Sequence, residues 1–348
     1  MQLGRKIRVL VVDDSVVFRE VLSKGISSDP IIEVVATAND PFDAREKIIK
    51  FDPDVLTCDI EMPRMNGIEF IKRLMPQYPL PIVVVSSVSD AVFNAMKAGA
   101  VDFVTKPDVQ SVKSVEAFIN ELIEKIKIAS AANVSHWKAN NALRRVVNRT
   151  DTRDRTCTDT KIKLIAIGAS TGGTEAIYNV LKSLPPDIPG IVIVQHMPPV
   201  FSRMFADRLN GSTQLRVREA RSGDYVEEGL VLIAPGDNHM RIKKVGNRLK
   251  TEVFKGEKLN GHCPSVDVLF ESVAKVCGSD AIGVILTGMG YDGAKGLLSM
   301  RKNGARTICQ DEESCVVYGM PKVAYNIGAA EKQVSLDKMA QTIISMLK

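Results

Sequence analysis

The chain has 348 residues, 45% of them hydrophobic and 25% charged, with a formal net charge of +5. This length predicts two domains, each able to bury its own core, and the mild charge does not call for a nucleic-acid partner. The longest apolar runs, such as Val9–Val12 and Ile191–Val194, are strand-length and far below the about 20 residues of a membrane span, so we expect a cytoplasmic protein that is not embedded in the membrane.

The first part of the chain alternates short β-branched runs with longer amphipathic segments. This alternation predicts a doubly wound parallel sheet covered by helices, a (βα)5 domain over residues 1–125. The predicted strands are Arg8–Val12, Ile32–Ala36, Val55–Cys58, Ile82–Val85 and Asp102–Val104. The predicted helices are Ser15–Ser27, Pro41–Phe51, Gly67–Tyr78, Ala91–Gly99 and Ser114–Ile128.

The pattern changes over residues 126–160, where apolar periodicity fades and Asn, Thr, Arg and Asp dominate. Such a composition cannot build a core and predicts a basic, polar linker. A solvated spacer is the favoured role, although its first residues also fit a helix.

A second α/β series fills residues 161–348 and predicts a second doubly wound domain. Its predicted strands are Lys163–Ile167, Ile191–Gln195, Leu230–Ala234, Ile282–Leu286 and Arg306–Cys309. Its predicted helices are Thr174–Leu184, Phe201–Leu209, Val266–Val276 and Gly293–Asn303. The stretch Met240–Phe254 is typical of a β-hairpin that turns near Gly246–Asn247.

Polar residues follow the predicted strands of the first domain. Asp13 and Asp14 come directly after the first strand and Asp59 after the third. Ligands of open α/β sheets bind beyond the carboxyl ends of the strands, so we expect these carboxylates to meet and to hold Mg²⁺. Ser86 and Lys106 end the fourth and fifth strands, where they can contact a phosphoryl group. Each residue alone fits a cap, a turn or a surface charge, but five at successive strand ends favour a site.

These residues resemble the response-regulator receiver family. The matching runs, over about residues 5–125, are Val11–Ser15, Cys58–Pro63, Ser86 and Thr105–Pro107. The resemblance implies that a histidine kinase phosphorylates Asp59. It also implies that Mg²⁺ is held by Asp13, Asp14, Asp59 and the backbone carbonyl of Glu61. Ser86 and Lys106 would contact the phosphate, and Phe103 holds the aromatic switch position of the family.

A glycine-rich turn, Gly168–Gly173, follows the first strand of the second domain. A dinucleotide-binding loop needs glycine where Ser170 stands and an acid where the next strand ends in Gln195 and His196, so we reject that interpretation. A structural turn with a helix cap also fits the motif alone. A G-x-S-x-G turn between strand and helix is typical of a serine nucleophile, and the helix N-terminus favours an oxyanion.

A serine nucleophile needs a base and an orienting acid. Among the four histidines we predict His196 as the base, because it ends the next strand at the same sheet edge as the serine. His136 lies in or near the linker, and His239 and His262 lie in loops beside the hairpin, where loop or substrate-contact roles suffice.

For the acid we predict Asp292, in the glycine-rich run Thr287–Gly293 after a strand. It can hold the imidazole as the acid of a triad does, and a turn residue or helix cap is the alternative. The resulting order, serine, histidine and aspartate, differs from that of the α/β-hydrolases, but triads are defined by geometry.

The second domain resembles the chemotaxis methylesterase family, CheB, over about residues 163–345. The matching runs are Ile167–Ile177, Gln195–Pro198, Ile233–Gly236, Pro264–Asp267, Thr287–Gly293 and Tyr318–Pro321. The resemblance implies Ser170 as nucleophile, His196 as base and then acid, and Asp292 as orienter. Backbone N–H groups near Thr171 and Met289 would be the oxyanion donors. The implied activities are hydrolysis of glutamyl methyl esters on chemoreceptors and deamidation of receptor glutamines, with no cofactor in the esterase chemistry.

The two resemblances together predict how the enzyme is controlled. We hypothesise that the unmodified receiver hinders access to the serine, and that phosphorylation of Asp59 relieves this by drawing Ser86 and Phe103 toward the phosphate. Two rival classes are a DNA-binding response regulator, which predicts a basic recognition helix, and a non-catalytic module that kept the fold.

Overall fold

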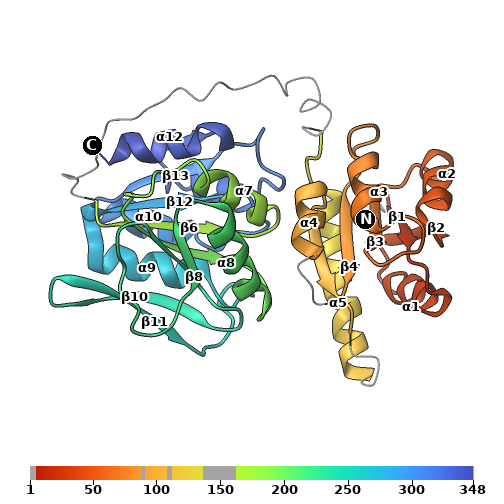
Figure 1. The fold of residues 1–348 in the computed structure, drawn as a ribbon, viewed down its shortest axis with the longest axis horizontal. Helices are drawn as coiled ribbons and strands as arrows, with labels where there is room; N and C mark the ends of the chain where they lie inside the picture. Colours follow the sequence, from red (N-terminus) through yellow and green to blue (C-terminus); the bar gives the residue numbers. More distant parts are fainter. Residues whose placement is uncertain (1–4, 88–90, 108–111, 136–161, 348) are drawn as a thin grey trace. The chain divides into compact units, whose positions relative to one another are not determined.

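A computed structural model describes residues 5–87, 91–107, 112–135 and 162–347. The chain forms two compact units, Met1–Val147 and Asn148–Lys348, each described by itself below (Figure 1). Most of the predicted linker, including His136, lies outside the described residues. Among the described residues, none of the helices is long and apolar enough to cross a bilayer.

The first unit is a parallel five-stranded sheet in the order β2-β1-β3-β4-β5. Its helices contact one another in pairs, α1 with α5 and α3 with α4, which confirms the predicted doubly wound architecture. The strands are β1 (Ile7–Val12), β2 (Ile32–Ala38), β3 (Val55–Asp59), β4 (Ile82–Ser86) and β5 (Asp102–Thr105). The helices are α1 (Val16–Ile26), α2 (Pro41–Phe51), α3 (Gly67–Leu74), α4 (Ala91–Ala98) and α5 (Val112–Ser130).

Local sequence determines where these helices begin. Ser15, Asp40 and Asn66 stand at the N-caps of α1, α2 and α3, and each side chain accepts a hydrogen bond from a backbone N–H of the first turn. Helix α3 ends at Leu74, earlier than predicted, and α5 continues to Ser130. The three central strands, β1, β3 and β4, are buried almost throughout, because both faces of a parallel sheet are covered.

The second unit is a parallel seven-stranded sheet in the order β14-β13-β12-β6-β7-β9-β8. The strands are β6 (Leu164–Ala169), β7 (Gly190–Gln195), β8 (Arg216–Glu219), β9 (Leu230–Ile233), β12 (Ala281–Ile285), β13 (Arg306–Gln310) and β14 (Lys332–Val334). The helices are α7 (Gly173–Leu181), α8 (Phe201–Ser212), α9 (Val266–Cys277), α10 (Ala294–Lys302), α11 (Met320–Asn326) and α12 (Leu336–Met346).

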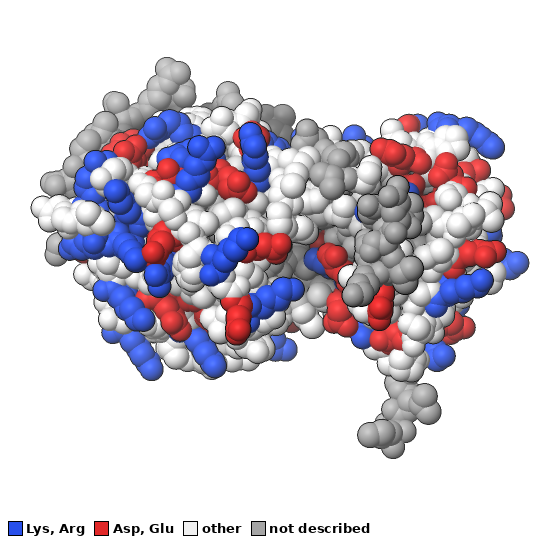
Figure 2. Space-filling model, turned by 90° about the horizontal axis from the view of Figure 1, so that it is seen from below, with Lys and Arg blue, Asp and Glu red and all other residues white. Residues whose placement is uncertain are grey.

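The predicted hairpin is confirmed as β10 (His239–Val245) paired antiparallel with β11 (Arg248–Phe254), and β10 contacts α9. It carries several basic side chains, but Arg241 and Lys243 both pair with Glu252, and Arg248 pairs with Glu227. Figure 2 shows Lys and Arg interspersed with Asp and Glu on the face drawn. The hairpin therefore does not present the single-sign field that a nucleic-acid footprint needs.

The order of strands in the second sheet reverses between β6 and β12. The chain runs from β6 outward through β7 to the edge strand β8, and β9 then fills the place between β7 and β8. It returns to β12 on the other side of β6 and continues outward to β14. Such a reversal opens a crevice beyond the carboxyl ends of the two central strands. The segments that follow β6 and β12 are the two glycine-rich runs in which the sequence predicts Ser170 and Asp292.

Candidate active site and phosphoacceptor pocket

The carboxyl ends of β1 and β3 bring three acidic side chains together. Carboxylate oxygens of Asp13, Asp14 and Asp59 lie within 4.8 Å of one another, and Asp13 and Asp59 are buried. Lys106 Nζ lies 2.7 Å from an oxygen of Asp59 and 3.1 Å from one of Asp13. One ammonium against three carboxylates leaves the pocket with an excess of negative charge, which suits a divalent cation.

The charges of this pocket shift its own titrations. Burial, opposed by Lys106 and reinforced by Asp59, raises the pKa of Asp13 above its usual value. Burial works to lower the pKa of Lys106, but hydrogen bonding and attraction to Asp59, with Asp13 beside it, raise it, so the lysine stays charged. The hydroxyl of Ser86 is buried and has no hydrogen-bond partner among the described residues. An orphan donor at the end of β4 fits an oxygen of a bound phosphoryl group.

The two other receiver residues that the sequence singles out lie beside this pocket. The backbone N–H of Glu61 donates to Asp59 Oδ1 at 3.3 Å, so Glu61 lies in the turn directly over the carboxylate. Phe103 is buried in β5 opposite Val84, two residues before Ser86 along the adjacent strand.

In the second unit, Ser170 directly follows β6 in the sharp turn that leads into α7. Its N–H donates to the carbonyl of Thr287 at 3.0 Å, and its own carbonyl accepts from the N–H of Gly173 at 2.7 Å. Gly172 has φ +78°, the left-handed conformation that favours glycine, and α7 begins at the next residue. The serine is therefore held at the N-terminus of a helix, as the G-x-S-x-G pattern predicts.

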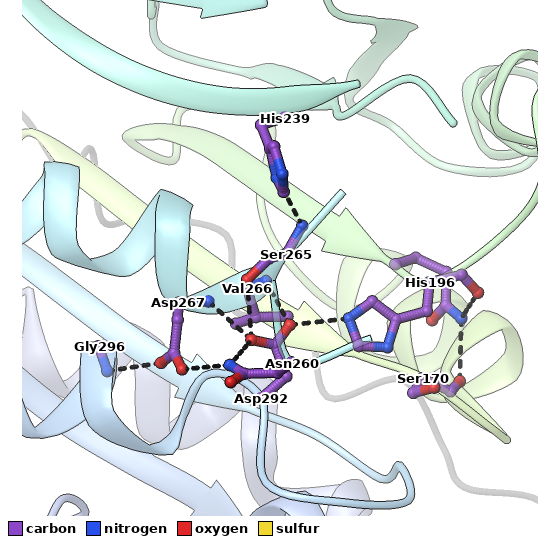
Figure 3. Close-up of polar contacts among 10 residues, drawn as sticks. Ser170, His196, His239, Asn260, Ser265, Val266, Asp267, Asp292 and Gly296 are labelled. Atoms are coloured by element: carbon purple, nitrogen blue, oxygen red, sulfur yellow. Dashed lines mark hydrogen bonds and ion pairs between the residues drawn. The ribbon is translucent and has the colours of Figure 1, made fainter. Parts of the chain in front are cut away.

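His196 follows β7 and meets Asp292, which is in the loop after β12. Imidazole Nε2 lies 2.9 Å from Asp292 Oδ2, and the side chains are 8% and 1% exposed (Figure 3). Because a carboxylate only accepts, Nε2 carries the proton of the neutral ring. Nδ1 is buried with no partner among the described residues, so its lone pair can accept a proton from another group.

Asp292 is fastened by donors from the segment that precedes α9 (Figure 3). Its oxygens accept from the backbone N–H of Val266 at 2.7 Å, from Ser265 Oγ at 2.8 Å and from Asn260 Nδ2 at 2.8 Å. The carboxylate thus caps the N-terminus of α9, where the helix dipole favours an anion. Burial works to raise the pKa of Asp292, but the hydrogen bond from His196, the attraction of that ring when it is protonated, and the other donors hold it well below its usual range.

Two further histidines surround this pair. The ring of His262 stacks on that of His196, with centroids 3.7 Å apart and an interplanar angle of 12°. His239 is buried, donates from Nε2 to the carbonyl of Glu257 at 2.8 Å and accepts at Nδ1 from the N–H of Ser265 at 3.2 Å. His262 thus contacts the predicted base directly, and His239 holds the residue that donates to Asp292.

The loop 287–293 also contacts the serine. A Cβ on Gly288 would stand 2.7 Å from Ser170 Cβ and 3.0 Å from its backbone N, so only glycine fits there. Met289 follows this glycine and is 45% exposed, whereas Thr171 is buried. The structure therefore brings the predicted triad and both predicted oxyanion residues to one end of the sheet.

Comparison with known proteins identifies this arrangement. The family model described as CheB methylesterase matches residues 165–343, and that of the response regulator receiver domain matches residues 9–117. A protein-glutamate methylesterase/protein-glutamine glutaminase from Syntrophomonas wolfei is 55% identical over 99% of this chain and 98% of its own length. The chain belongs to the CheB methylesterase family.

Two further comparisons support the assignment to the CheB methylesterase family. A protein of the same description from Syntrophotalea carbinolica is 53% identical over 99% of both chains. The crystal structure of the Thermotoga maritima CheB methylesterase catalytic domain superposes with a TM-score of 0.52 and 38% identity, covering 53% of this chain and 98% of that one. A DNA-binding output domain is accordingly not favoured.

Several residues of this candidate site were not found from the sequence. Ser265 and Asn260 were not singled out, and His262 was considered only as a loop or substrate-contact residue. Gln195 entered as an argument against a dinucleotide site and as the first residue of the matching run Gln195–Pro198, with no role of its own. Pro264–Asp267 was noticed as a matching run, and this was the one signal that pointed to the segment that holds Asp292.

Proposed function

We propose that the chain is a phosphorylation-regulated hydrolase of the glutamyl methyl esters of chemoreceptors, releasing methanol, and that it also deamidates receptor glutamines. The names of its full-length relatives support both activities. The observation that carries the proposal is the contact of His196 Nε2 with the buried Asp292 carboxylate, at the sheet edge where Ser170 follows β6.

In the proposed mechanism Ser170 Oγ attacks the γ-carbonyl of the ester and His196 accepts its proton at Nδ1. The proton on Nε2 stays with the hydrogen bond to Asp292, which stabilises the imidazolium that forms. Asp292 remains ionised throughout, because its low pKa makes transfer to it unfavourable. The carboxylate therefore orients and stabilises rather than taking the proton.

The negative charge that develops on the substrate oxygen needs preorganised donors. We assign this role to backbone N–H groups near Thr171 and Met289, since Thr171 opens the turn before α7 and Met289 follows the glycine packed on Ser170. Loss of one such donor typically costs about 10²–10³-fold in kcat.

Collapse of the tetrahedral intermediate expels the leaving group, which takes its proton from His196. The group is methanol from an ester and ammonia from a glutamine, and in both cases a glutamyl acyl-enzyme remains on Ser170. Water activated by His196 then releases glutamate and restores the serine. No step requires a cofactor.

The acidic pocket of the first unit is proposed as the control site. Asp59 accepts the phosphoryl group from a histidine kinase, and Asp13, Asp14, Asp59 and the carbonyl of Glu61 would hold Mg²⁺. The bound ion would offset the charge of the entering phosphoryl group. Lys106, already against Asp59, and the orphan hydroxyl of Ser86 would contact the phosphate oxygens, and Phe103 would respond to the movement of Ser86.

The proposed regulatory and catalytic domains follow one another along the chain. We propose a receiver domain at residues 1–125, a linker at 126–160 and a catalytic domain at 161–348, working in the cytoplasm. The unmodified receiver is proposed to hinder the esterase, so a chain limited to residues 160–348 should be faster than the unphosphorylated full chain. Equal rates would contradict inhibition by the receiver.

A serine-directed fluorophosphonate probe tests whether the second domain is an enzyme or a binding module. The wild type should be labelled and Ser170→Ala should not, because the serine is then missing. Labelling of Ser170→Ala at the rate of the wild type would overturn the assignment of the nucleophile. Absence of labelling in both would favour the non-catalytic module.

A further inference from the structure

A buried glutamine joins the turn of the nucleophile to the base. Gln195, the last residue of β7, is 3% exposed. Its Nε2 donates to the carbonyl of Ser170 at 2.9 Å and to the carbonyl of His196 at 3.0 Å. Two carbonyl acceptors require the NH₂ end of the amide at this position, which determines the orientation of the side chain.

The sheet ladder itself stops just before the catalytic residues. Ala169 and Gln195 are the last partners of the β6–β7 pair, and the N–H of His196 donates once more to the carbonyl of Ala169 at 3.1 Å. Ser170 and His196 then diverge into separate turns. The side-chain amide of Gln195 continues the cross-strand bonding by one residue, because it holds the carbonyls of both.

We propose that Gln195 is a positioning residue that sets the separation of Ser170 and His196 in the esterase reaction. This inference rests on the proposed function. Acyl transfer requires the serine oxygen and the imidazole nitrogen at hydrogen-bond distance, and a misplacement of about 1 Å can cost about 10²-fold. Gln195 touches neither reacting atom, so it acts through the backbones of the two residues that do.

The neighbouring Gly173 makes room for this amide. A Cβ on Gly173 would stand 2.0 Å from Gln195 Oε1 and 2.7 Å from the Ala169 Cβ. Its φ is not in the positive region, so space and not backbone conformation excludes a side chain. Gln195 Oε1 is buried with no partner among the described residues, so the donors on Nε2 are what hold the amide in place.

Two independent substitutions should therefore disturb the same side chain. Gln195→Met keeps the length and loses both hydrogen bonds. Gly173→Ala adds a methyl that pushes the amide away, although alanine is otherwise the better residue in a helix. Gly211→Ala is the matched control, because Gly211 lies in α8 with nothing within 4 Å of the added Cβ.

The experiment measures methanol release from methylated receptor membranes and the rate of fluorophosphonate labelling at Ser170, in the full-length chain. We expect Gln195→Met and Gly173→Ala to lower kcat and the labelling rate by about 10- to 100-fold. KM should stay within about twofold, because substrate binding is untouched. The amount labelled at completion should stay at one probe per chain; a partly unfolded preparation would instead lower that amount and leave the rate unchanged.

A double-variant cycle separates positioning from general packing. Once Gln195→Ala has removed the amide, the added methyl of Gly173→Ala meets only the Ala169 Cβ at 2.7 Å, so Gly173→Ala should lower the rate clearly less in the Gln195→Ala background than in the wild type. Losses that multiply would overturn the inference, and so would a Gln195→Met labelling rate equal to that of the wild type. If Ser170→Ala, assayed alongside, released methanol like the wild type, the proposed function would fail instead.

Discussion

Replacing Asp292 by asparagine should damage both stability and catalysis, because the carboxylate serves two purposes. The new NH₂ group is a donor, yet every contact of Asp292 that the structure records is with a donor, among them Val266 N–H, Ser265 Oγ, Asn260 Nδ2 and His196 Nε2. Placing the NH₂ at the Oδ2 position loses the fewest contacts, and it leaves the Val266 N–H buried and unpaired and His196 without its acceptor.

The magnitudes follow from these losses. An unsatisfied buried donor costs about 1–3 kcal/mol, which for a unit of this size lowers the melting temperature by roughly 2–12 °C. Loss of the orienting acceptor should lower kcat by about 10³–10⁴-fold, as in other serine triads.

Thermal unfolding and methanol release of Asp292→Asn would be compared with those of Asp207→Asn, an exposed position in α8. The control should match the wild type in both assays. If Asp292→Asn kept full activity, Asp292 would not be the acid, and if it melted like the wild type, the network around α9 would be misassigned.

Further expectations concern stacking, pH and the receiver. The stack of His262 on His196 contributes about 0.5–1.5 kcal/mol, so His262→Ala should lower kcat about two- to twelvefold. His262→Phe keeps an aromatic ring and should keep most of the rate. Equal losses of kcat in the two variants would argue against stacking. Because the folded pKa of Asp292 is held below its unfolded value of about 3.9, its contribution to stability is complete above that pH and is lost as the pH falls below it. The unfolding midpoint of Asp292→Asn should therefore drop less between pH 6 and pH 3 than that of the wild type, and parallel curves would contradict this. Ser86→Ala should weaken the stimulation by a phosphodonor, measured as the ratio of methanol release with and without the donor, whereas an unchanged ratio would remove Ser86 from the switch.

The regular alternation of buried strands and amphipathic helices made the fold predictable. The central strands are continuous apolar runs, and each was found to within two residues at either end. The edge strands β8 and β14 were missed, because Arg216–Glu219 and Lys332–Val334 are short, partly exposed and mostly polar. Helix α12 was not predicted as an element, although its buried residues Met339, Ile343 and Met346 follow a helical spacing.

The triad could be predicted from the sequence because each member follows a strand or sits in a distinctive glycine-rich run. The residues that contact Asp292 and His196 lie in no such recognisable motif. Asn260 and Ser265 reach Asp292 only after the chain has folded back from the hairpin, and His262 meets His196 across 66 positions of sequence. The sequence also could not predict which nitrogen of His196 carries the proton, since either nitrogen could face the acid. The contact with Asp292 in the structure assigns the proton to Nε2.

Methanol release from methylated receptor membranes tests whether Ser170 carries an esterase activity that phosphorylation of Asp59 controls. Wild type, Ser170→Ala and Asp59→Asn would be compared with and without a small-molecule phosphodonor and Mg²⁺. We expect that the donor stimulates the wild type, that Asp59→Asn releases methanol at a rate the donor does not change, and that Ser170→Ala releases none. Full activity in Ser170→Ala, or no methanol from any of the three, would contradict this expectation.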